Sequence, residues 1–412
     1  MTARAARQAP AAAPLRTRNY RLYFFGQLVS VPGTWLQTVA QAWLVLQLGA
    51  SGSALGATAA LQTLPILLLG AWTGAMADAL DKRTLLIATQ AVQGALALGL
   101  GLLTISGVVR LWMVMVLALG LGVARAFDVP ARQAFVSELV EGPELPRAIG
   151  INSTVASAAR MIGPAAGGII IAVLGVGECF LVNGASFLGP MCGLMVMDTN
   201  QLHRPDVRAA RAPRAVRDGL RYVRSRRSLL VPLVMMAIVG TLAFEFQVTI
   251  PLMADSVFHL GATGFGLLYA ALGLGAVVSG VTLAGKVPGN LRTLTISAAA
   301  FGVTLAACAV APSPASAAVC LALAGAASVV YSSTTNAVLQ IRAAPEMRGR
   351  VVALYVIAFA GSTAIGGPLV GLAAEAFGAR ASMAVGAIGC AVAAFIGAPA
   401  PGRAWRGARW RR

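Results

Sequence analysis

Twelve long apolar runs follow one another along this chain, and they constrain its fold more than any other feature. Each is close to the ~20 residues that an α-helix needs to cross the hydrocarbon core of a bilayer, and charges or clusters of Gly, Pro and Ser separate them. The runs lie at about residues 21–48, 54–77, 84–106, 111–129, 148–174, 179–198, 229–251, 264–285, 292–311, 315–337, 350–374 and 381–398. We therefore expect an all-α membrane protein with twelve transmembrane helices.

The composition agrees with a chain surrounded by lipid. Hydrophobic residues make up 58% of the chain and charged residues only 11%. So few polar side chains cannot cover a water-soluble core of this size, whereas lipid solvates the outside of a helical membrane protein directly.

The net charge of +18 is carried by clusters at the ends of the apolar runs, which argues against a nucleic-acid partner. An even number of crossings places both termini on one side. With the termini inside, 29 of the 32 Lys and Arg are cytoplasmic, while Arg110 and Arg380 lie outside and Arg160 lies within a run. The sequence therefore predicts a multi-pass protein of a bacterial cytoplasmic (inner) membrane, with both termini in the cytoplasm.

Cysteine and histidine give no sign of a metal or disulfide framework. The five cysteines are scattered without a C-x-x-C pair, and the only histidines are His203 and His259. We expect no metal and no cofactor.

A duplication is indicated by two short matches. Residues 143–145 (PEL) match 345–347 (PEM) at an offset of 202, and Gly163-Pro164 match Gly367-Pro368 at 204. These offsets are close to half the chain, so we expect two pseudo-symmetric six-helix bundles.

The longest polar stretch, with nine arginines, separates these halves. The predicted units are residues 1–198, a basic cytoplasmic linker at 199–228, and residues 229–412. Within the linker, residues 215–230 are predicted to form a helix on anionic headgroups or else a solvated connection.

The stretch GAMADALDKR, residues 74–83, resembles the loop between the second and third helices of the major facilitator superfamily, G-x-L-a-D-r-x-G-r-k. Matching places are held by Gly74, Met76, Ala77, Asp78, Lys82 and Arg83. Ala79 replaces the usual Arg and Asp81 the usual Gly, a form common among the bacterial drug and siderophore exporters of this family. From residue 18 to the last run, the chain resembles that branch, which includes the enterobactin-exporter type.

The resemblance implies a cytoplasmic gate in which Asp78 is a latch. Its partners would be the start of the eleventh helix and an arginine at the end of the fourth, and the contact would hold the protein outward-facing. The gate residues so implied are Gly74, Asp78, Asp81, Lys82, Arg83, Arg125, Asp128, Arg132, Arg348 and Arg350. A plain positive-inside hairpin would explain Lys82 and Arg83, but not Asp78.

The run at 148–174 resembles the family's antiporter motif, G-x8-G-x3-G-P-x2-G-G. Gly150, Gly163, Pro164, Gly167 and Gly168 match, and Ala159 replaces the second glycine. The resemblance implies a bent, closely packed hinge helix and export, although a generic Gly-rich packing face has the same pattern. The family's fourth-helix arginine is missing, since Val116 stands in its place.

Two charges lie inside apolar runs, where an ionisable side chain is a functional candidate. Glu245, ~25 Å along its run at ~1.5 Å per residue, is a candidate for proton coupling or for a cation anchor, or else a structural carboxylate. Arg160 either pairs internally or contacts an anionic substrate. Gln27, Gln37, Gln41 and Gln62 either face a polar cavity or bridge helices.

Together these features predict a monomeric secondary transporter working by alternating access, which exports a small amphipathic molecule in exchange for protons. The alternative is an importer or a lipid or solute facilitator of the same fold. Neither a phosphate-binding G-x-x-x-x-G-K-[ST] nor an H-E-x-x-H sequence is present, so an ATP-driven pump and an enzyme are not expected.

Overall fold

The computed structural model describes residues 13–203, 219–283, 287–344 and 347–398, apart from a few side chains within helices, among them those of Asp78 and Arg160. Over these residues the chain forms twelve successive helical rods, which overlap the twelve apolar runs. Nine stretches in the described part are long and apolar enough to cross a membrane. The predicted all-α membrane fold is confirmed.

The first six rods are α2 (Arg18–Gln47), α3 (Gly52–Ala79), α4 (Lys82–Ile105), α5 (Leu111–Leu139), α6 (Leu145–Val173), and α7 (Val176–Ser186) continued by α8 (Leu188–Met195). The next six are α10 (Arg227–Ala243) continued by α11 (Phe246–Leu252) and the π-helical turn η4 (Met253–Val257), α12 (Ala262–Leu283), α13 (Leu291–Ala309), α14 (Pro314–Arg342), α15 (Arg348–Ala360) continued by α16 (Ser362–Phe377), and α17 (Ala379–Gly397).

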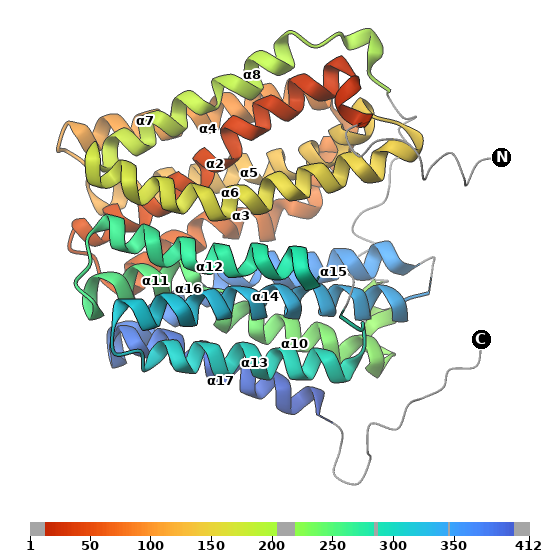
Figure 1. The fold of residues 1–412 in the computed structure, drawn as a ribbon. Helices are drawn as coiled ribbons and strands as arrows, with labels where there is room; N and C mark the ends of the chain where they lie inside the picture. Colours follow the sequence, from red (N-terminus) through yellow and green to blue (C-terminus); the bar gives the residue numbers. More distant parts are fainter. Residues whose placement is uncertain (1–12, 204–218, 284–286, 345–346, 399–412) are drawn as a thin grey trace.

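The two sets of rods form two bundles with the same packing pattern (Figure 1). In the first bundle α3 packs on α5, α4 on α7, and α2 on α6. The second bundle repeats these pairs in order, with α12 on α14, α13 on α17, and α10 on α15 and α16. A repeat of helix neighbours is what a duplicated six-helix unit produces, because each helix keeps the face that it buries.

Two pairs of helices join the bundles, α3 with α16 and α6 with α12. We call the end of the molecule where α2 begins and α17 ends the terminal end, and the opposite end the far end (Figure 1). At the far end, glycines bring backbones together across both pairs. A Cβ on Gly266 of α12 would lie 2.7 Å from the Cα of Gly168 in α6, and a Cβ on Gly367 of α16 would lie 2.8 Å from the carbonyl oxygen of Gly56 in α3.

Glycines of the same helices near the terminal end have open space around them. No neighbouring atom lies within 4 Å of a Cβ built on Gly74, Gly150 or Gly349. In addition, α3 meets the eleventh rod mainly through α16, its far-end segment, and only slightly through α15. The bundles are therefore in close contact at the far end and diverge at the terminal end.

The described part of the linker packs on protein. Residues 219–224 are helical, and Val223 is fully buried. The Tyr222 hydroxyl accepts a hydrogen bond from the Ala344 amide (3.0 Å), and a Cβ on Gly219 would touch Arg350 at the start of α15. This segment is thus neither a free connection nor a helix resting only on lipid. Residues 204–218 lie outside the described residues, and the boundaries 1–198, 199–228 and 229–412 stay a prediction.

Candidate functional site

The loop between α3 and α4 ties the start of α4 to the first bundle. Asp81 caps α4 by accepting a hydrogen bond from the Thr84 amide (2.8 Å). Lys82 forms a buried ion pair with Glu138 near the end of α5 (2.8 Å). These contacts hold together helices of one bundle, and sequence reasoning had not found Glu138 as a partner. The only feature of the sequence that could have pointed to Glu138 is its position just beyond the fourth apolar run.

Arg83 has a similar role within the same bundle. Its guanidinium donates hydrogen bonds to the carbonyl oxygens of Leu194 (2.6 Å) and Met195 (3.0 Å) at the end of α8. The last carbonyls of a helix have no partner inside the helix and carry partial negative charge, so a cation there is stabilising.

The predicted latch lies at the terminal ends of α3 and α15. Asp78 is in the last turn of α3, and its side chain lies outside the described residues. Arg348 donates to the carbonyl oxygen of Gln340 (3.1 Å), and Arg350 lies 3.4 Å from the sulfur of Met347. The pairing of Asp78 with these arginines therefore stays a prediction.

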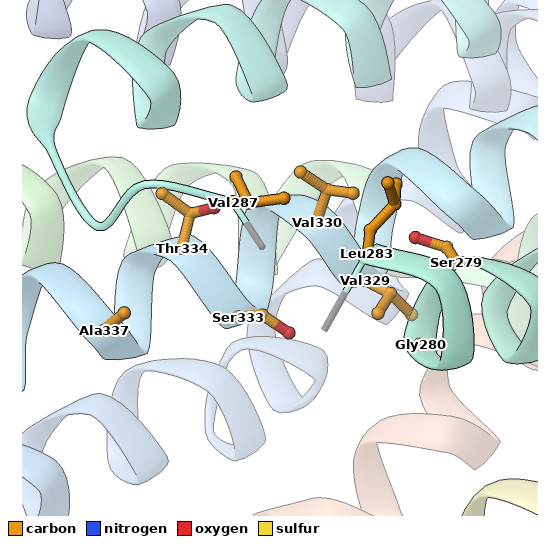
Figure 2. A pocket seen from close by; sticks show the side chains of 9 residues that line it. All are labelled: Ser279, Gly280, Leu283, Val287, Val329, Val330, Ser333, Thr334 and Ala337. Carbon is orange, nitrogen blue, oxygen red and sulfur yellow. The ribbon is translucent and has the colours of Figure 1, made fainter. Parts of the chain in front are cut away.

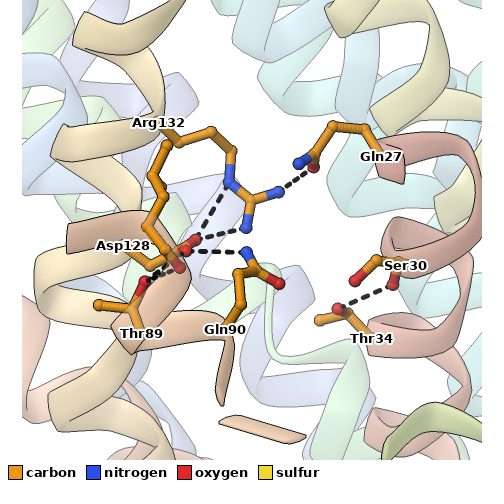
Figure 3. Close-up of polar contacts among 8 residues, drawn as sticks. Gln27, Ser30, Thr34, Thr89, Gln90, Asp128 and Arg132 are labelled. Atoms are coloured by element: carbon orange, nitrogen blue, oxygen red, sulfur yellow. Dashed lines mark hydrogen bonds and ion pairs between the residues drawn. The ribbon is translucent and has the colours of Figure 1, made fainter. Parts of the chain in front are cut away.

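Asp128 is the centre of a polar network near the terminal end of the first bundle (Figure 3). Its side chain is buried, and one oxygen accepts hydrogen bonds from the Thr89 hydroxyl (3.1 Å) and the Gln90 amide (3.0 Å). The other oxygen accepts from Arg132 (3.0 Å), whose guanidinium also donates to Gln27. The network joins α2, α4 and α5, and buried charges with several partners of this kind are stabilised by them.

Several members of this network were expected and others were not. Asp128 and Arg132 are four residues apart and share one face of α5, as their spacing allows. Arg125 lies close enough to interact electrostatically with Asp128. Thr89 and Gln90 lie in a different helix, and no local sequence pattern predicts their contact with Asp128. Gln27 bridges two helices, one of the two roles left open for it.

The motif glycines of α6 have two different neighbours. Gly163 and Gly167 face α2: a Cβ on Gly163 would lie 2.7 Å from the carbonyl oxygen of Pro32, and one on Gly167 would lie 3.4 Å from Leu36. Gly168 faces α12 of the other bundle, whereas Gly150 has open space beside it. The motif thus packs α6 against its own bundle and against the opposite one.

Pro164 and Ala159 occupy the same stretch. Pro164 is buried inside α6, which continues through it, and Ala159 is almost fully buried where the family pattern has a glycine. The side chain of Arg160 lies outside the described residues, so its role stays a prediction.

Glu245 lies at the break between α10 and α11, buried between helices. It is 1% exposed, and neither carboxylate oxygen has a hydrogen-bond or ion-pair partner among the described residues. Thr363 lies nearby without hydrogen-bond geometry to the carboxylate. Gly366 of α16 leaves room for the group, since a Cβ there would lie 2.7 Å from Oε1. A buried carboxylate without a partner is costly, and such groups mark functional positions.

The other three candidate glutamines also bridge helices. Gln37 of α2 accepts a hydrogen bond from Asn183 of α7, and Gln41 of α2 accepts one from Gln62 of α3 (2.9 Å). The Gln41 amide nitrogen has no partner in the described structure, although it is buried.

A separate pocket of about 120 Å³ lies between α12 and α14 (Figure 2). Aliphatic side chains and the hydroxyls of Ser279, Ser333 and Thr334 line it, and none of the described residues that line it is charged. It lies within the second bundle, so it is not a site between the two bundles.

Comparison with known proteins identifies the chain. A family described as transmembrane secretion effector matches residues 9–408. The chain belongs to this family. Transmembrane secretion effectors are a branch of the major facilitator superfamily, so the predictions of a transporter and of no enzyme are confirmed.

Individual transporters are similar to this transmembrane secretion effector over most of their length. The chain is 23% identical to the staphyloferrin A transporter of Staphylococcus aureus over 363 residues, 87% of this chain and 90% of the relative. It is 26% identical to the multidrug efflux pump Tap of Mycobacterium tuberculosis over 344 residues, 80% and 81% of the two chains.

Among solved structures, the fold is similar to that of a bacterial homologue of the human lysosomal transporter Spinster in an inward-facing, unoccupied conformation. The TM-score is 0.75 at 14% identity, covering 93% of this chain and 96% of the other.

Proposed function

We propose that this transmembrane secretion effector exports a small amphipathic molecule across a bacterial cytoplasmic membrane in exchange for protons, as a monomer with both termini in the cytoplasm. In this proposal the terminal end is cytoplasmic and the far end is external. The described conformation would then be open to the cytoplasm and closed to the outside. An importer or a lipid or solute facilitator is the alternative.

The observation that carries the proposal is the unequal contact between the bundles. Both inter-bundle seams are closed by glycine-lined backbone contact at the far end, and the same helices diverge at the terminal end. A transporter that alternates access needs two such ends that close in turn, and a static channel does not.

Proton coupling is supported by Glu245. Its carboxylate is buried, lies at a helix break, and has no fixed partner among the described residues. Such a group can bind a proton in one conformation and release it in another if its access to water changes. Arg160 is a second candidate, for pairing or for an anionic substrate.

Relatives support the direction and the class of substrate. A multidrug efflux pump and a siderophore transporter match most of this chain. In our proposal the gate is the set Gly74, Asp78, Asp81, Lys82, Arg83, Arg125, Asp128, Arg132, Arg348 and Arg350. The motif of α6, Gly150, Gly163, Pro164, Gly167 and Gly168, is the hinge.

Transport in inverted membrane vesicles tests the proposal. Vesicles containing the full-length protein receive an imposed proton gradient, acid inside, and a panel that includes a macrolide, a fluorescent cationic dye and an iron-free siderophore. Accumulation that a protonophore abolishes supports proton-coupled export. Accumulation only in right-side-out vesicles indicates import, and gradient-independent equilibration indicates a facilitator; either result contradicts the proposal.

A further inference from the structure

A small cavity lies beneath the closed far end, where the two bundles meet. Its polar lining comes from Thr38 and Gln41 of α2, Thr58 and Gln62 of α3, and Gln247 of α11, together with three apolar side chains. The first four residues belong to the first bundle and Gln247 to the second. The cavity therefore exists only while α11 rests against α2 and α3.

The size of this cavity admits one water-sized group. Its volume is about 20 Å³, counted as the space open to the centre of a water molecule. About 10–15 Å³ on this measure is enough for one water, if two to four polar partners surround it. The five polar side chains meet that condition.

The lining contains an unused hydrogen-bonding atom. Gln41 and Gln62 share one hydrogen bond (2.9 Å), and Gln41 is 2% exposed with its amide nitrogen unpartnered in the described structure. If both amides were turned over, their hydrogen bond would again use one atom of Gln41 and leave the other for the cavity.

The threonines complete the pattern. The hydroxyls of Thr38 and Thr58 donate to backbone carbonyls of their own helices, Thr34 (3.0 Å) and Ala54 (2.8 Å). Their oxygens are left as acceptors. The cavity therefore combines donors and acceptors, and none of the described residues that line it is charged.

We propose that this cavity is a binding subsite for one uncharged oxygen: a hydroxyl or carbonyl group of the transported molecule, or a water molecule when the transporter is empty. The inference rests on the proposed transport function and names one recognition element of its substrate. A charged group is disfavoured, because the described lining offers no counter-charge and burial of an unpaired ion is costly.

The position of the subsite makes its affinity depend on conformation. When the far end opens, Gln247 moves away with the second bundle, and the bound oxygen loses its partners there. A ligand that binds one conformation better shifts the equilibrium towards it. The subsite would hold the substrate in the far-end-closed state and release it on opening.

High-resolution electron microscopy of the full-length protein in lipid nanodiscs is the first test. In the far-end-closed state without added compound, we expect density for one water within hydrogen-bonding distance of the Gln41 amide. A second structure with the best exported compound of the vesicle assay separates the two sources: its oxygen replaces the water, or the water remains. An empty cavity with the Gln41 amide bonded to protein in both structures overturns the subsite, and this outcome can be reached even if no compound is exported.

Transport by a matched pair of variants is the second test. Gln41→Leu removes the free amide from the cavity. Gln93→Leu removes a buried glutamine whose amide nitrogen also has no partner among the described residues, but which lies in α4 and does not line the cavity. Loss of one hydrogen bond to a neutral group predicts an increase of about two- to tenfold in the half-saturating concentration for Gln41→Leu alone. Equal values for both variants would overturn the assignment of the substrate to this subsite.

Discussion

The two inter-bundle seams are closed at the far end and open at the terminal end, and different kinds of residue lie at the two ends. At the far end, Gly56 meets Gly367 and Gly168 meets Gly266, so backbone lies on backbone. At the terminal end, charged residues gather on the same helices and on the loops beside them. One end depends on close van der Waals contact, which needs small residues, and the other is suited to electrostatic contacts.

This difference indicates that closure of the far end and closure of the terminal end are stabilised by different forces. Backbone contact between glycines has a short range and is lost after a small displacement. The attraction between a carboxylate and a helix N-terminus or an arginine acts over several ångströms, and water and salt weaken it. We expect mutations at the far end to act through shape and those at the terminal end through charge.

The largest expected effect comes from filling the far-end seam. Gly56→Leu places a side chain where the backbone of Gly367 now lies. Overpacking costs roughly 1–3 kcal/mol, so the far-end-open population should rise by a factor of about 5 to 150. The measurement is labelling of an added Gln247→Cys by a membrane-impermeant maleimide from outside, corrected for the parent without that cysteine. Gly70→Leu is the control, because nothing lies within 4 Å of its Cβ position; equal labelling of both variants would contradict a closed far end.

Loss of the latch carboxylate should have the next largest effect. Asp78→Asn removes the charge that we expect to bind the start of α15. A charge-assisted contact of about 1.5 kcal/mol corresponds to a transport rate about tenfold lower, with unchanged abundance in the membrane. Asp198→Asn is the matched control, since Asp198 lies outside the gate set, caps a short helix by accepting from the Asn200 amide, and asparagine caps a helix as well as aspartate does. Wild-type transport by Asp78→Asn would remove the latch.

The variant Glu245→Gln tests whether this carboxylate couples the opening and closing of the two ends to proton binding. Glutamine keeps the shape beside Gly366 but cannot bind or release a proton. Export driven by a proton gradient should then vary less than about twofold across the physiological pH range, where wild type varies more. Initial vesicle rates over a pH series measure this, with Glu375→Gln as the exposed carboxylate control. A pH profile like that of wild type would exclude Glu245 as the coupling site.

The smallest expected effect concerns a polar contact across the far-end seam. Glu375 of α16 accepts a hydrogen bond from the Ser53 amide at the start of α3 (3.4 Å). Because the carboxylate is exposed, Glu375→Gln should raise far-end labelling by less than about twofold. High salt should reduce the difference from wild type, and Asp255→Asn, which lies beside the same surface without that contact, should have no effect. A tenfold change would mean that charge also governs this end.

The sequence predicted the rods well because the length of an apolar run is a local property. The breaks inside rods were harder to predict. Phe244 and Glu245 interrupt the seventh rod, and Gly361 interrupts the eleventh. A single charge or a single glycine inside an apolar run does not by itself indicate a break. Predicting which side chains pair between helices was harder still. Lys82 was singled out, but Glu138 lies 56 positions further on, and no periodicity connects them.

By itself, the sequence determined that this chain spans a membrane as two similar bundles of helices, because hydrophobic length, charge placement and duplication are written along the chain. Only the tertiary structure decided which ends of the seams touch, that the Asp128 oxygens accept hydrogen bonds from side chains of α4 and α5, and that Glu245 is buried without a hydrogen-bond partner among the described residues. Those outcomes depend on residues brought together from distant parts of the chain. Gly56 and Gly367 meet because both lack a side chain at the same depth, a match that neither segment reveals alone.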